Sequence, residues 1–498
     1  MTDREFDLLL EEQLTDLPPN DDLVAEITPW RRAANRILLG TALCSITLNF
    51  LLLNYLLPAI GLGLILLGFR SLRRENRWFR AGYAVAAARM IQCIFNLILS
   101  ATIWGEPYRE ATGWMTVIGV SLSILHALCI WGSFRAVQIK ADAEQSSKGF
   151  WLVIFFVIIT VLGVAGFQNS LVILILLVLY ILLLRSLWKY AGLLDDAGYA
   201  VQASPVRLSD RALTIVLAVI TAVGILCGYL FCGQYPMEWA EKDTVSAEAE
   251  AVKRKLLSMD FPSYVLEDLT EDEILACANA KNVYAESSEE AFNDGQIVIE
   301  GDAYYGSYYH THTEYPVREL LVTHVLVEPA DGGNWIIFEH FLWQQNPGYR
   351  GTDTVQVWPA YARNDGWDKG SRLSGRVLYD RDGLTYAAAY YDLEELTYTS
   401  TTFFGAYECT DILASFSLPY RGKKCRGYVC YDMEMVEEGW LISSWCNYSY
   451  QEFPAYPQLP GHDFVVGSYS LNDQGYRTRQ TQLSIRPNEI EAPYEPEE

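Results

Sequence analysis

The chain has 498 residues, which is enough for more than one domain, and its formal net charge is −24. Residues 234–498 carry about −25, whereas residues 1–233 are close to neutral. Such an acidic surface repels nucleic acid, so we exclude a nucleic-acid partner. The acidic half can attract cations, although solubility is the simpler explanation of its charge.

The first 30 residues are polar and acidic and lack the basic and apolar regions of a cleavable signal peptide. Within them, residues 3–15 place Phe6, Leu9, Leu10 and Leu14 at helical spacing, which predicts a short amphipathic helix. A membrane-surface helix is usually rich in Lys and Arg, but the polar face here is acidic. We therefore expect this helix to bind a cytoplasmic protein partner.

Several runs in the first half are apolar enough to cross a bilayer, which takes about 20 residues as a helix. The run from Ile37 to Phe69 has arginines on both sides, and basic flanks stay in the cytoplasm. We therefore predict two spans there, meeting near Asn54–Pro58. Later runs bring the total to about seven transmembrane helices: 81–104, 114–134, 150–167, 171–184 and 212–231.

Basic residues recur in alternate loops of this bundle. Arg135, Lys140 and Lys148 lie on one predicted side, while Arg109 is the lone basic residue of the loops predicted on the other. The pattern predicts a plasma-membrane protein with a cytoplasmic N-terminus and everything after Phe231 outside.

Few polar residues interrupt the spans, and Arg89, Asn96 and His126 form a candidate intramembrane polar cluster. Hydrogen bonding between helices explains them most simply, and a transport or lipid-headgroup site is the alternative. Cation-coupled carriers usually need intramembrane carboxylates, and the predicted spans contain none.

The segment 234–282 after the last span predicts a linker and a short helical neck. Ser246 to Met259 consists of helix formers. Thr270 and Glu273 have the spacing of a capping box, which predicts a helix over 271–280.

From about Gln296 the hydrophobic period changes to two, with tight-turn signals between short segments. We therefore predict a mainly antiparallel, sandwich-like β domain over 283–486, followed by a disordered acidic tail over 487–498. The predicted strands are 296–304, 319–328, 334–343, 353–360, 374–380, 384–391, 396–405, 410–417, 427–436, 440–450 and 464–470.

The predicted β domain contains Cys409, Cys425, Cys430 and Cys446. If strands 428–436 and 440–450 form a hairpin, Cys430 faces Cys446, and disulfides are permitted outside the membrane. A Cys430–Cys446 bridge and four free thiols are the competing expectations. The CxxC spacing of closed zinc sites is missing, so we predict no resident metal or cofactor.

The β domain contains two histidine patterns, and packing within the sheet explains each of them more simply than metal binding does. His310 and His312 with Glu314 place metal-ligand types on one strand face, but such a pattern is more typical of sheet packing. His324 and His340 lie in adjacent predicted strands and are expected to pair across a hairpin.

The β domain also contains acid pairs and many aromatic rings. Asp365/Asp368 and Glu394/Glu395 have the residue types of glycosidase carboxylates, but any acidic chain supplies such pairs. Aromatic rings beside carboxylates suit a glycan or a peptide, and ordinary sandwich packing is the alternative. The candidate ligand-binding aromatics are Tyr305, Tyr309, Trp343, Trp358 and Trp367.

The architecture resembles that of bacterial multi-pass proteins with a cell-surface β domain, an analogy that carries no function. We expect a membrane-anchored surface binding or sensing protein rather than an enzyme. A transporter or channel subunit with an extracellular cap is the alternative, and a surface hydrolase is the third. The expected domains are 1–30 (cytoplasmic), 31–233 (transmembrane bundle), 234–282 (neck), 283–486 (β domain) and 487–498 (tail).

Overall fold

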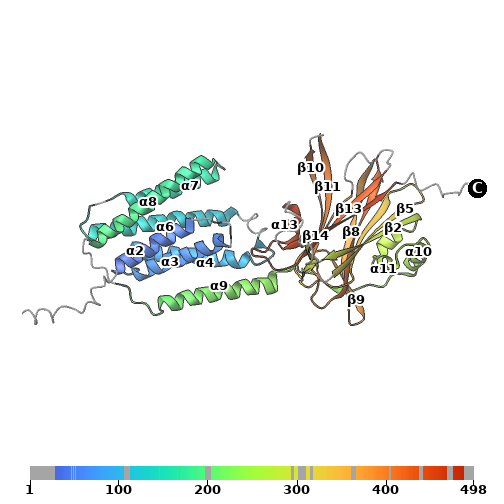
Figure 1. Cartoon of the computed structure of the whole chain (residues 1–498), viewed down its shortest axis with the longest axis horizontal. Coiled ribbons are helices and arrows are strands. Elements are labelled where there is room, and N and C mark those ends of the chain that lie inside the picture. The colour runs from blue at the N-terminus through green and yellow to red at the C-terminus, as the bar shows by residue number, and fades with distance from the viewer. Residues whose placement is uncertain are drawn as a thin grey trace, which may run out of the picture. The chain divides into compact units, whose positions relative to one another are not determined.

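The computed structural model describes residues 28–45, 48, 50, 52–105, 113–144, 146–167, 169–196, 203–292, 296–300, 310–314, 318–359, 366–402, 405–436, 441–467 and 475–486. The chain divides into two compact units (Figure 1). The helical unit comprises Met1–Leu99 and Pro107–Leu226, and the β unit comprises Ser100–Glu106 and Cys227–Glu498. The helix predicted at 3–15 and the tail at 487–498 lie outside the described residues.

The described part of the helical unit consists of helices of 17 to 28 residues. They are α2 (Pro29–Ser45), α3 (Leu53–Ser71), α4 (Arg77–Leu99), α6 (Gly113–Lys140), α7 (Lys148–Val164), α8 (Ser170–Asp196) and α9 (Asp210–Cys232). Five of them, α3, α4, α6, α8 and α9, are long and apolar enough to cross a membrane. With 17 residues each, α2 and α7 are about 25 Å long, shorter than a typical hydrocarbon core.

The run from Ile37 to Phe69 does break into two helices, but earlier than predicted. Helix α2 ends at Ser45 and α3 begins at Leu53, so Pro58 lies inside α3 rather than at its start. The two helices pack closely at Gly40, where an added Cβ would lie 2.4 Å from the Gly61 carbonyl oxygen. Glycine therefore permits the close backbone approach that holds the pair together.

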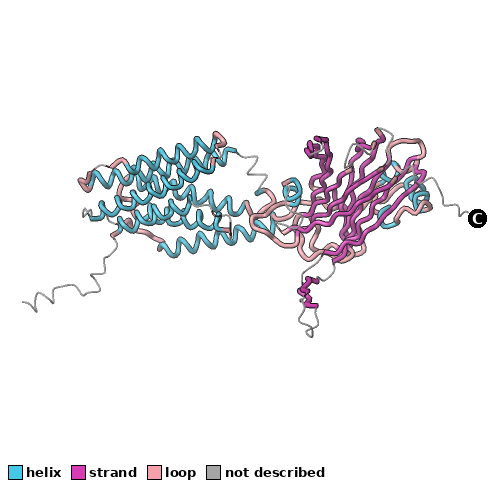
Figure 2. The backbone as a smooth tube through the Cα atoms, turned by 45° about the horizontal axis from the view of Figure 1, so that its top comes forward, coloured by secondary structure: helices cyan, strands magenta, loops and turns pink. Residues whose placement is uncertain are grey.

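The β unit is built on two large antiparallel sheets (Figure 2). The seven-stranded sheet has the order β1 (Ala240–Glu241), β9 (Leu384–Ala389), β8 (Trp367–Arg381), β12 (Lys423–Met435), β6 (Trp335–Trp343), β5 (Arg318–Pro329) and β2 (Ala280–Phe292). The five-stranded sheet has the order β10 (Asp392–Thr402), β11 (Gly405–Phe416), β7 (Asp353–Trp358), β13 (Ile442–Gln451) and β14 (Tyr476–Ile485). A separate hairpin joins β3 (Gln296–Glu300) to β4 (His310–Glu314).

Three layers result from the alternation of side chains along the strands. On β12, Val429, Tyr431 and Met433 enter the core between the two sheets, as the period-two pattern predicts. Tyr428 and Cys430 enter a second core on the other face. That second core is covered by three short helices: α10 (Ala247–Leu257), α11 (Ser263–Leu266) and α12 (Glu271–Ala276).

The neck helices confirm part of the sequence analysis. Thr270 and Glu273 form the predicted capping box at the start of α12. The helix ends at Ala276 rather than near 280, because β2 begins at Ala280. The neck is therefore a layer of the β unit, since its side chains pack on the seven-stranded sheet.

Several strand predictions were wrong. Strands β2 and β14 were missed. A strand was predicted at 464–470, but residues 464–466 form the end of helix α13 (Gly461–Val466). Strands β12 and β13 do not form the predicted hairpin, because they belong to different sheets. Consecutive strands that cross between sheets build the sandwich, as is common in this architecture.

Candidate functional site

The structure brings Arg89 and His126 of the predicted intramembrane polar cluster together and places Asn96 apart from them. His126 on α6 is fully buried, and its Nε2 lies 3.1 Å from Thr41 Oγ1 on α2. Thr41 Oγ1 in turn donates to the Ile37 carbonyl at 2.7 Å, so the imidazole Nε2 donates to the hydroxyl. Arg89 interacts electrostatically with His126, but Asn96 is exposed two turns further along α4. Helix-to-helix hydrogen bonding therefore describes His126 better than a polar path does.

Sequence reasoning missed the hydroxyl groups that complete this contact. Tyr180 on α8 donates its phenol to the Thr41 carbonyl at 3.0 Å. The same phenol lies 2.7 Å from Ser45 Oγ on α2. Neither Tyr180 nor Ser45 carries a charge or a motif, so no sequence signal distinguishes them from other residues of the spans.

Two of the predicted ligand-binding aromatics are core residues. Trp343 is fully buried, and its Nε1 donates to Tyr448 Oη at 3.0 Å. Trp367 is 4% exposed and packs against Trp335 at a centroid distance of 5.7 Å. Trp358 is half-buried, 6.5 Å from the Trp445 ring, and Tyr305 and Tyr309 lie outside the described residues. The packing explanation is therefore correct for Trp343 and Trp367.

The predicted Cys430–Cys446 bridge is not formed, and both residues are free thiols. Cys430 packs on the helix-covered face of the seven-stranded sheet. Cys446 lies on β13 and enters the core between the sheets. The bridge prediction depended on a β12–β13 hairpin, which these strands do not make.

The two histidines expected to pair across a hairpin instead bind separate carboxylates. In the register of β5 and β6, His324 lies opposite Glu339 and His340 lies opposite Thr323. His324 Nδ1 contacts the Glu339 carboxylate, and His340 Nε2 lies 3.0 Å from Asp268 Oδ2. Burial opposes the charge on His324, but Glu339 prevails and raises the pKa of the imidazole. The side chains of the His310–Glu314 strand lie outside the described residues.

A half-buried group of titratable side chains lies on the outer face of the five-stranded sheet. We call it the carboxylate–histidine cluster: Asp392, Glu394, His462 and Asp463. Asp392 and Glu394 share a face of the edge strand β10, because side chains two apart on a strand point the same way. Leu393 between them packs toward the core. Helix α13 contacts the same sheet through β7, β11 and β13, and so brings His462 to the two carboxylates.

The packing of α13 depends on a glycine at its first position. The Gly461 N–H donates to Thr352 Oγ1 at 3.0 Å. An added Cβ at Gly461 would lie 2.5 Å from Thr354 Oγ1, so only glycine allows the helix to approach β7 this closely. This approach sets the position of His462 against β10.

Both imidazole nitrogens of His462 are engaged by carboxylates. Nε2 lies 2.7 Å from Glu394 Oε1, and Nδ1 lies 3.1 Å from Asp463 Oδ1. The hydrogen bond that His462 donates to Asp463 raises the pKa of His462 to about 9 against the opposing effect of burial, with Glu394 adding to the rise. Burial and the neighbouring Glu394 raise the pKa of Asp392. Around one imidazolium, three carboxyl groups leave the cluster with an excess of negative charge.

Three of these side chains also lie close enough together to hold a metal ion. One ligand atom each from Asp392, Glu394 and His462 lies within 4.8 Å of the others. Carboxylate oxygens with an imidazole nitrogen suit Mn²⁺ or Zn²⁺. The predicted acid pair Glu394/Glu395 is split by the strand, because Glu394 joins this cluster while Glu395 binds Lys369 Nζ at 2.5 Å.

His462 belongs to the segment 455–463. This segment also forms hydrogen bonds with the two stretches of chain that connect the β unit to the helical unit. Gln458 donates from its backbone N–H to the Ser100 carbonyl at 2.7 Å and from its side-chain Nε2 to the Gly233 carbonyl at 3.2 Å. Ser100 directly follows α4, and Gly233 directly follows α9. Tyr229, in the last turn of α9, donates to the Ala455 carbonyl. Residues 455–463 therefore connect the cluster to both segments.

Tyr235 provides a second connection within the β unit. The His462 N–H donates to Tyr235 Oη at 3.3 Å, and the Tyr235 ring stacks on Tyr391 at 4.5 Å. Tyr235 lies two residues after Gly233, and Tyr391 immediately precedes Asp392. Sequence reasoning missed this arrangement, because 68 residues separate Glu394 from His462. The spacing of Asp392 and Glu394 in a strand was the only local signal.

Comparison with known proteins gives no family for this chain, since neither a protein family nor a curated protein matches the sequence.

Proposed function

We propose that this protein is a multi-pass membrane protein that senses a cation through its β unit. In this proposal the N-terminus is cytoplasmic and the β unit is extracytoplasmic, as the basic loops predict. Five apolar helices support contact with a lipid bilayer. The ligand is a divalent cation bound by Asp392, Glu394 and His462, rather than a glycan or peptide held by aromatic rings.

One observation carries the proposal: the segment 455–463 holds His462 at one end and contacts two membrane-proximal chain segments at the other. Gln458 bonds to both Ser100 and Gly233. A cation that replaces the His462–Glu394 hydrogen bond, with release of the imidazole proton, shifts His462 and thereby acts on the segments that follow α4 and α9. The proposal does not extend to transport, because His126 is buried against Thr41 and Asn96 is exposed apart from it.

Binding is tested with the full chain in lipid nanodiscs. Calorimetric titration with MnCl₂, ZnCl₂ and CaCl₂ should detect saturable binding of at least one cation. Glu394→Gln should weaken that binding by more than about tenfold, since it removes one charged ligand. Glu395→Gln is the matched control, because Glu395 binds Lys369 instead of the cluster. Absence of binding, or equal loss in both variants, would refute the cation site.

Coupling is tested by hydrogen exchange of the same nanodisc sample. The cation should slow exchange at residues 100–105 and 227–235 in the natural chain. Gln458→Leu removes the side-chain hydrogen bond to the Gly233 carbonyl but keeps the backbone bond to Ser100 and the ligands, so it should bind the cation without slowing exchange at residues 227–235. Unchanged exchange in the natural chain would leave a cation-binding protein without a sensing role. Protease treatment of intact cells should cleave the β unit if it is extracytoplasmic.

A further inference from the structure

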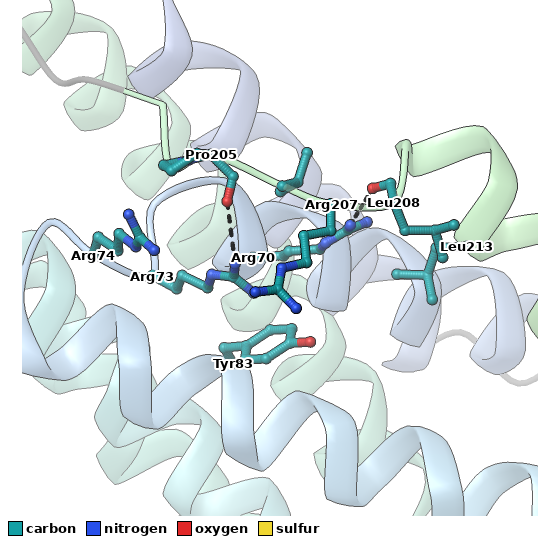
Figure 3. Close-up of a pocket in the computed structure, with 9 residues that line it drawn as sticks. Arg70, Arg73, Arg74, Tyr83, Pro205, Arg207, Leu208 and Leu213 are labelled. Atoms are coloured by element: carbon teal, nitrogen blue, oxygen red, sulfur yellow. Dashed lines mark hydrogen bonds between the residues drawn. The ribbon is translucent and has the colours of Figure 1, made fainter.

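A basic pocket lies at one end of the helical unit, apart from the site described above. Its volume is about 460 Å³, and it is formed by the last turn of α3, the start of α4 and the segment that leads into α9 (Figure 3). Four arginines line it: Arg70, Arg73, Arg74 and Arg207. Tyr83, Val206, Leu208 and Leu213 supply its less polar wall.

Backbone contacts hold the two sides of the pocket together. The Ser204 N–H donates to the Ser71 carbonyl at 2.7 Å, and the Arg74 N–H donates to Ser204 Oγ at 3.1 Å. Arg73 donates from its guanidinium to the Pro205 carbonyl at 3.1 Å. The segment before α9 is therefore pinned to the α3–α4 connection, which fixes where the arginine side chains start.

The positive charges in the pocket exceed their negative partners. Arg70 lies 3.3 Å from Asp210 Oδ1 and also donates to the Leu208 carbonyl. Asp210 is shared with Arg36, which lies 2.7 Å from the other carboxylate oxygen. Among the described residues, the structure pairs neither Arg74 nor Arg207 with a carboxylate.

Two guanidinium groups point at each other. Figure 3 shows Arg73 and Arg207 converging above Tyr83, and the Arg73 Cζ lies 5.8 Å from the Tyr83 ring centroid. Like charges held close together are unfavourable unless an anion lies between or beside them. Two planar guanidinium forks match the oxygens of a phosphate group.

We propose that this pocket binds a phosphate group, and that an anionic lipid headgroup is its source. The pocket lies at the shared ends of α3, α4 and α9, three of the helices that are apolar enough to cross a membrane. Tyr83 lies six residues into α4, about 9 Å below its first residue, where amphipathic rings meet the interface. Basic pockets between membrane helices recognise lipid headgroups by this chemistry.

Arginines beside spans also occur simply because basic loops stay in the cytoplasm. The two explanations differ in whether position matters. A topological role needs only charge near the helix ends, whereas a phosphate site needs the converging arginines. Arg32 on α2 and Arg185 on α8 are exposed and do not line the pocket, so they provide a charge-matched comparison.

The test uses the full chain in nanodiscs of phosphatidylcholine with or without phosphatidylglycerol. Native mass spectrometry should show phosphatidylglycerol retained by the natural chain. Arg73→Gln/Arg207→Gln should weaken that retention by about thirtyfold, whereas Arg32→Gln/Arg185→Gln should change it little. Equal loss in the two double variants, or no selective retention by the natural chain, would overturn the pocket.

Two further measurements separate the outcomes. Arg73→Lys/Arg207→Lys keeps the charge but loses the bidentate forks, so intermediate retention is expected from a folded protein. In discs of phosphatidylcholine alone, inorganic phosphate should not raise the unfolding temperature. If inorganic phosphate raises the unfolding temperature of the natural chain but not that of Arg73→Gln/Arg207→Gln, the pocket binds phosphate. The ligand would then be a soluble phosphate compound rather than a lipid headgroup.

Discussion

The helical unit and the β unit expose and bury opposite kinds of side chain. On α8, Leu174, Leu179 and Leu182 are more than half exposed, at 57%, 51% and 55%. In the β unit, Asp268 and Glu339 are each 1% exposed and His340 is fully buried. A continuous exposed apolar face is unfavourable in water, and a buried charge is unfavourable without partners. Each unit is therefore suited to a different solvent.

The two units also satisfy their buried polar groups differently. The Asp268 carboxylate accepts a hydrogen bond from His340 at 3.0 Å and a bifurcated one from Arg426 Nε, at 2.8 Å to Oδ2 and 2.9 Å to Oδ1. In the helical unit, Thr41 and Tyr180 use hydroxyl groups and helix carbonyls instead. The charge of Asp268 is tolerated because partners from distant strands surround it, whereas Thr41 and Tyr180 in the bundle make their contacts with neutral groups.

The largest expected effect comes from removing the buried carboxylate of Asp268, which lies between α11 and α12. Asp268→Ala leaves Arg426 and His340 without their buried partner, which should lower the free energy of unfolding by about 4 kcal/mol. Urea unfolding of the full chain in detergent, followed by tryptophan fluorescence, measures the change. The neighbouring Glu267 is exposed, so Glu267→Ala should be nearly neutral. A loss below about 1 kcal/mol in Asp268→Ala would contradict the partner argument.

The opposite experiment adds a charge to the exposed apolar face. Leu182 lies near the middle of the span Ser170–Asp195, and an arginine there should disfavour membrane insertion by about 3 kcal/mol. Leu193→Arg is the control, because Leu193 is 62% exposed near the end of the same helix. Membrane insertion and carbonate extraction should distinguish the two variants. Equal behaviour would mean that α8 does not face hydrocarbon along its length.

Asp353 tests how strictly the β unit requires a partner for a buried charge. Burial raises the pKa of this carboxyl from 3.8 to about 7, although Tyr448 and the Gln451 N–H donate to it. Between pH 3.8 and about pH 7, the Asp353 carboxyl is therefore protonated in the folded state and ionised in the unfolded state. Its contribution to stability is present at low pH and is lost as the pH rises through about 7.

The loss from Asp353 should be about 2.5 kcal/mol between pH 5 and pH 8. Asp353→Asn cannot titrate, so the difference between the natural chain and this variant isolates the effect from other groups. Urea unfolding at the two pH values gives the four free energies required. The same difference at both pH values would show that the folded-state pKa of Asp353 is close to its usual value.

The sequence predicted features that depend on neighbouring residues. Apolar runs located the helices of the bundle, and the alternation of Val429, Tyr431 and Met433 located the core face of β12. Strands β2 and β14 were missed because both lie at sheet edges, where polar and charged residues are tolerated. The β12–β13 hairpin was wrong because local alternation does not reveal which sheet a strand joins.

The candidate site was beyond prediction for a related reason. Asp392 and Glu394 lie at the start of β10, which the sequence placed only from 396. His462 reaches them through the packing of α13 at Gly461, a contact that no spacing in the chain encodes. Trp343 and Trp367 were wrongly assigned to a ligand because a buried tryptophan has the same sequence signature as an exposed one.

The smallest expected effect concerns a feature that the sequence predicted correctly. In the capping box of α12, the Thr270 N–H donates to Glu273 Oε2 at 2.8 Å and the Glu273 N–H donates to Thr270 Oγ1 at 3.4 Å. Thr270→Ala removes one of these bonds and should lower the unfolding free energy by about 1 kcal/mol. Thr270→Ser keeps the hydroxyl and should restore most of it. Because Glu273 also accepts from Tyr428 and Ser374, a loss well above this value would show that the cap holds the neck against the sheet as well as starting a helix.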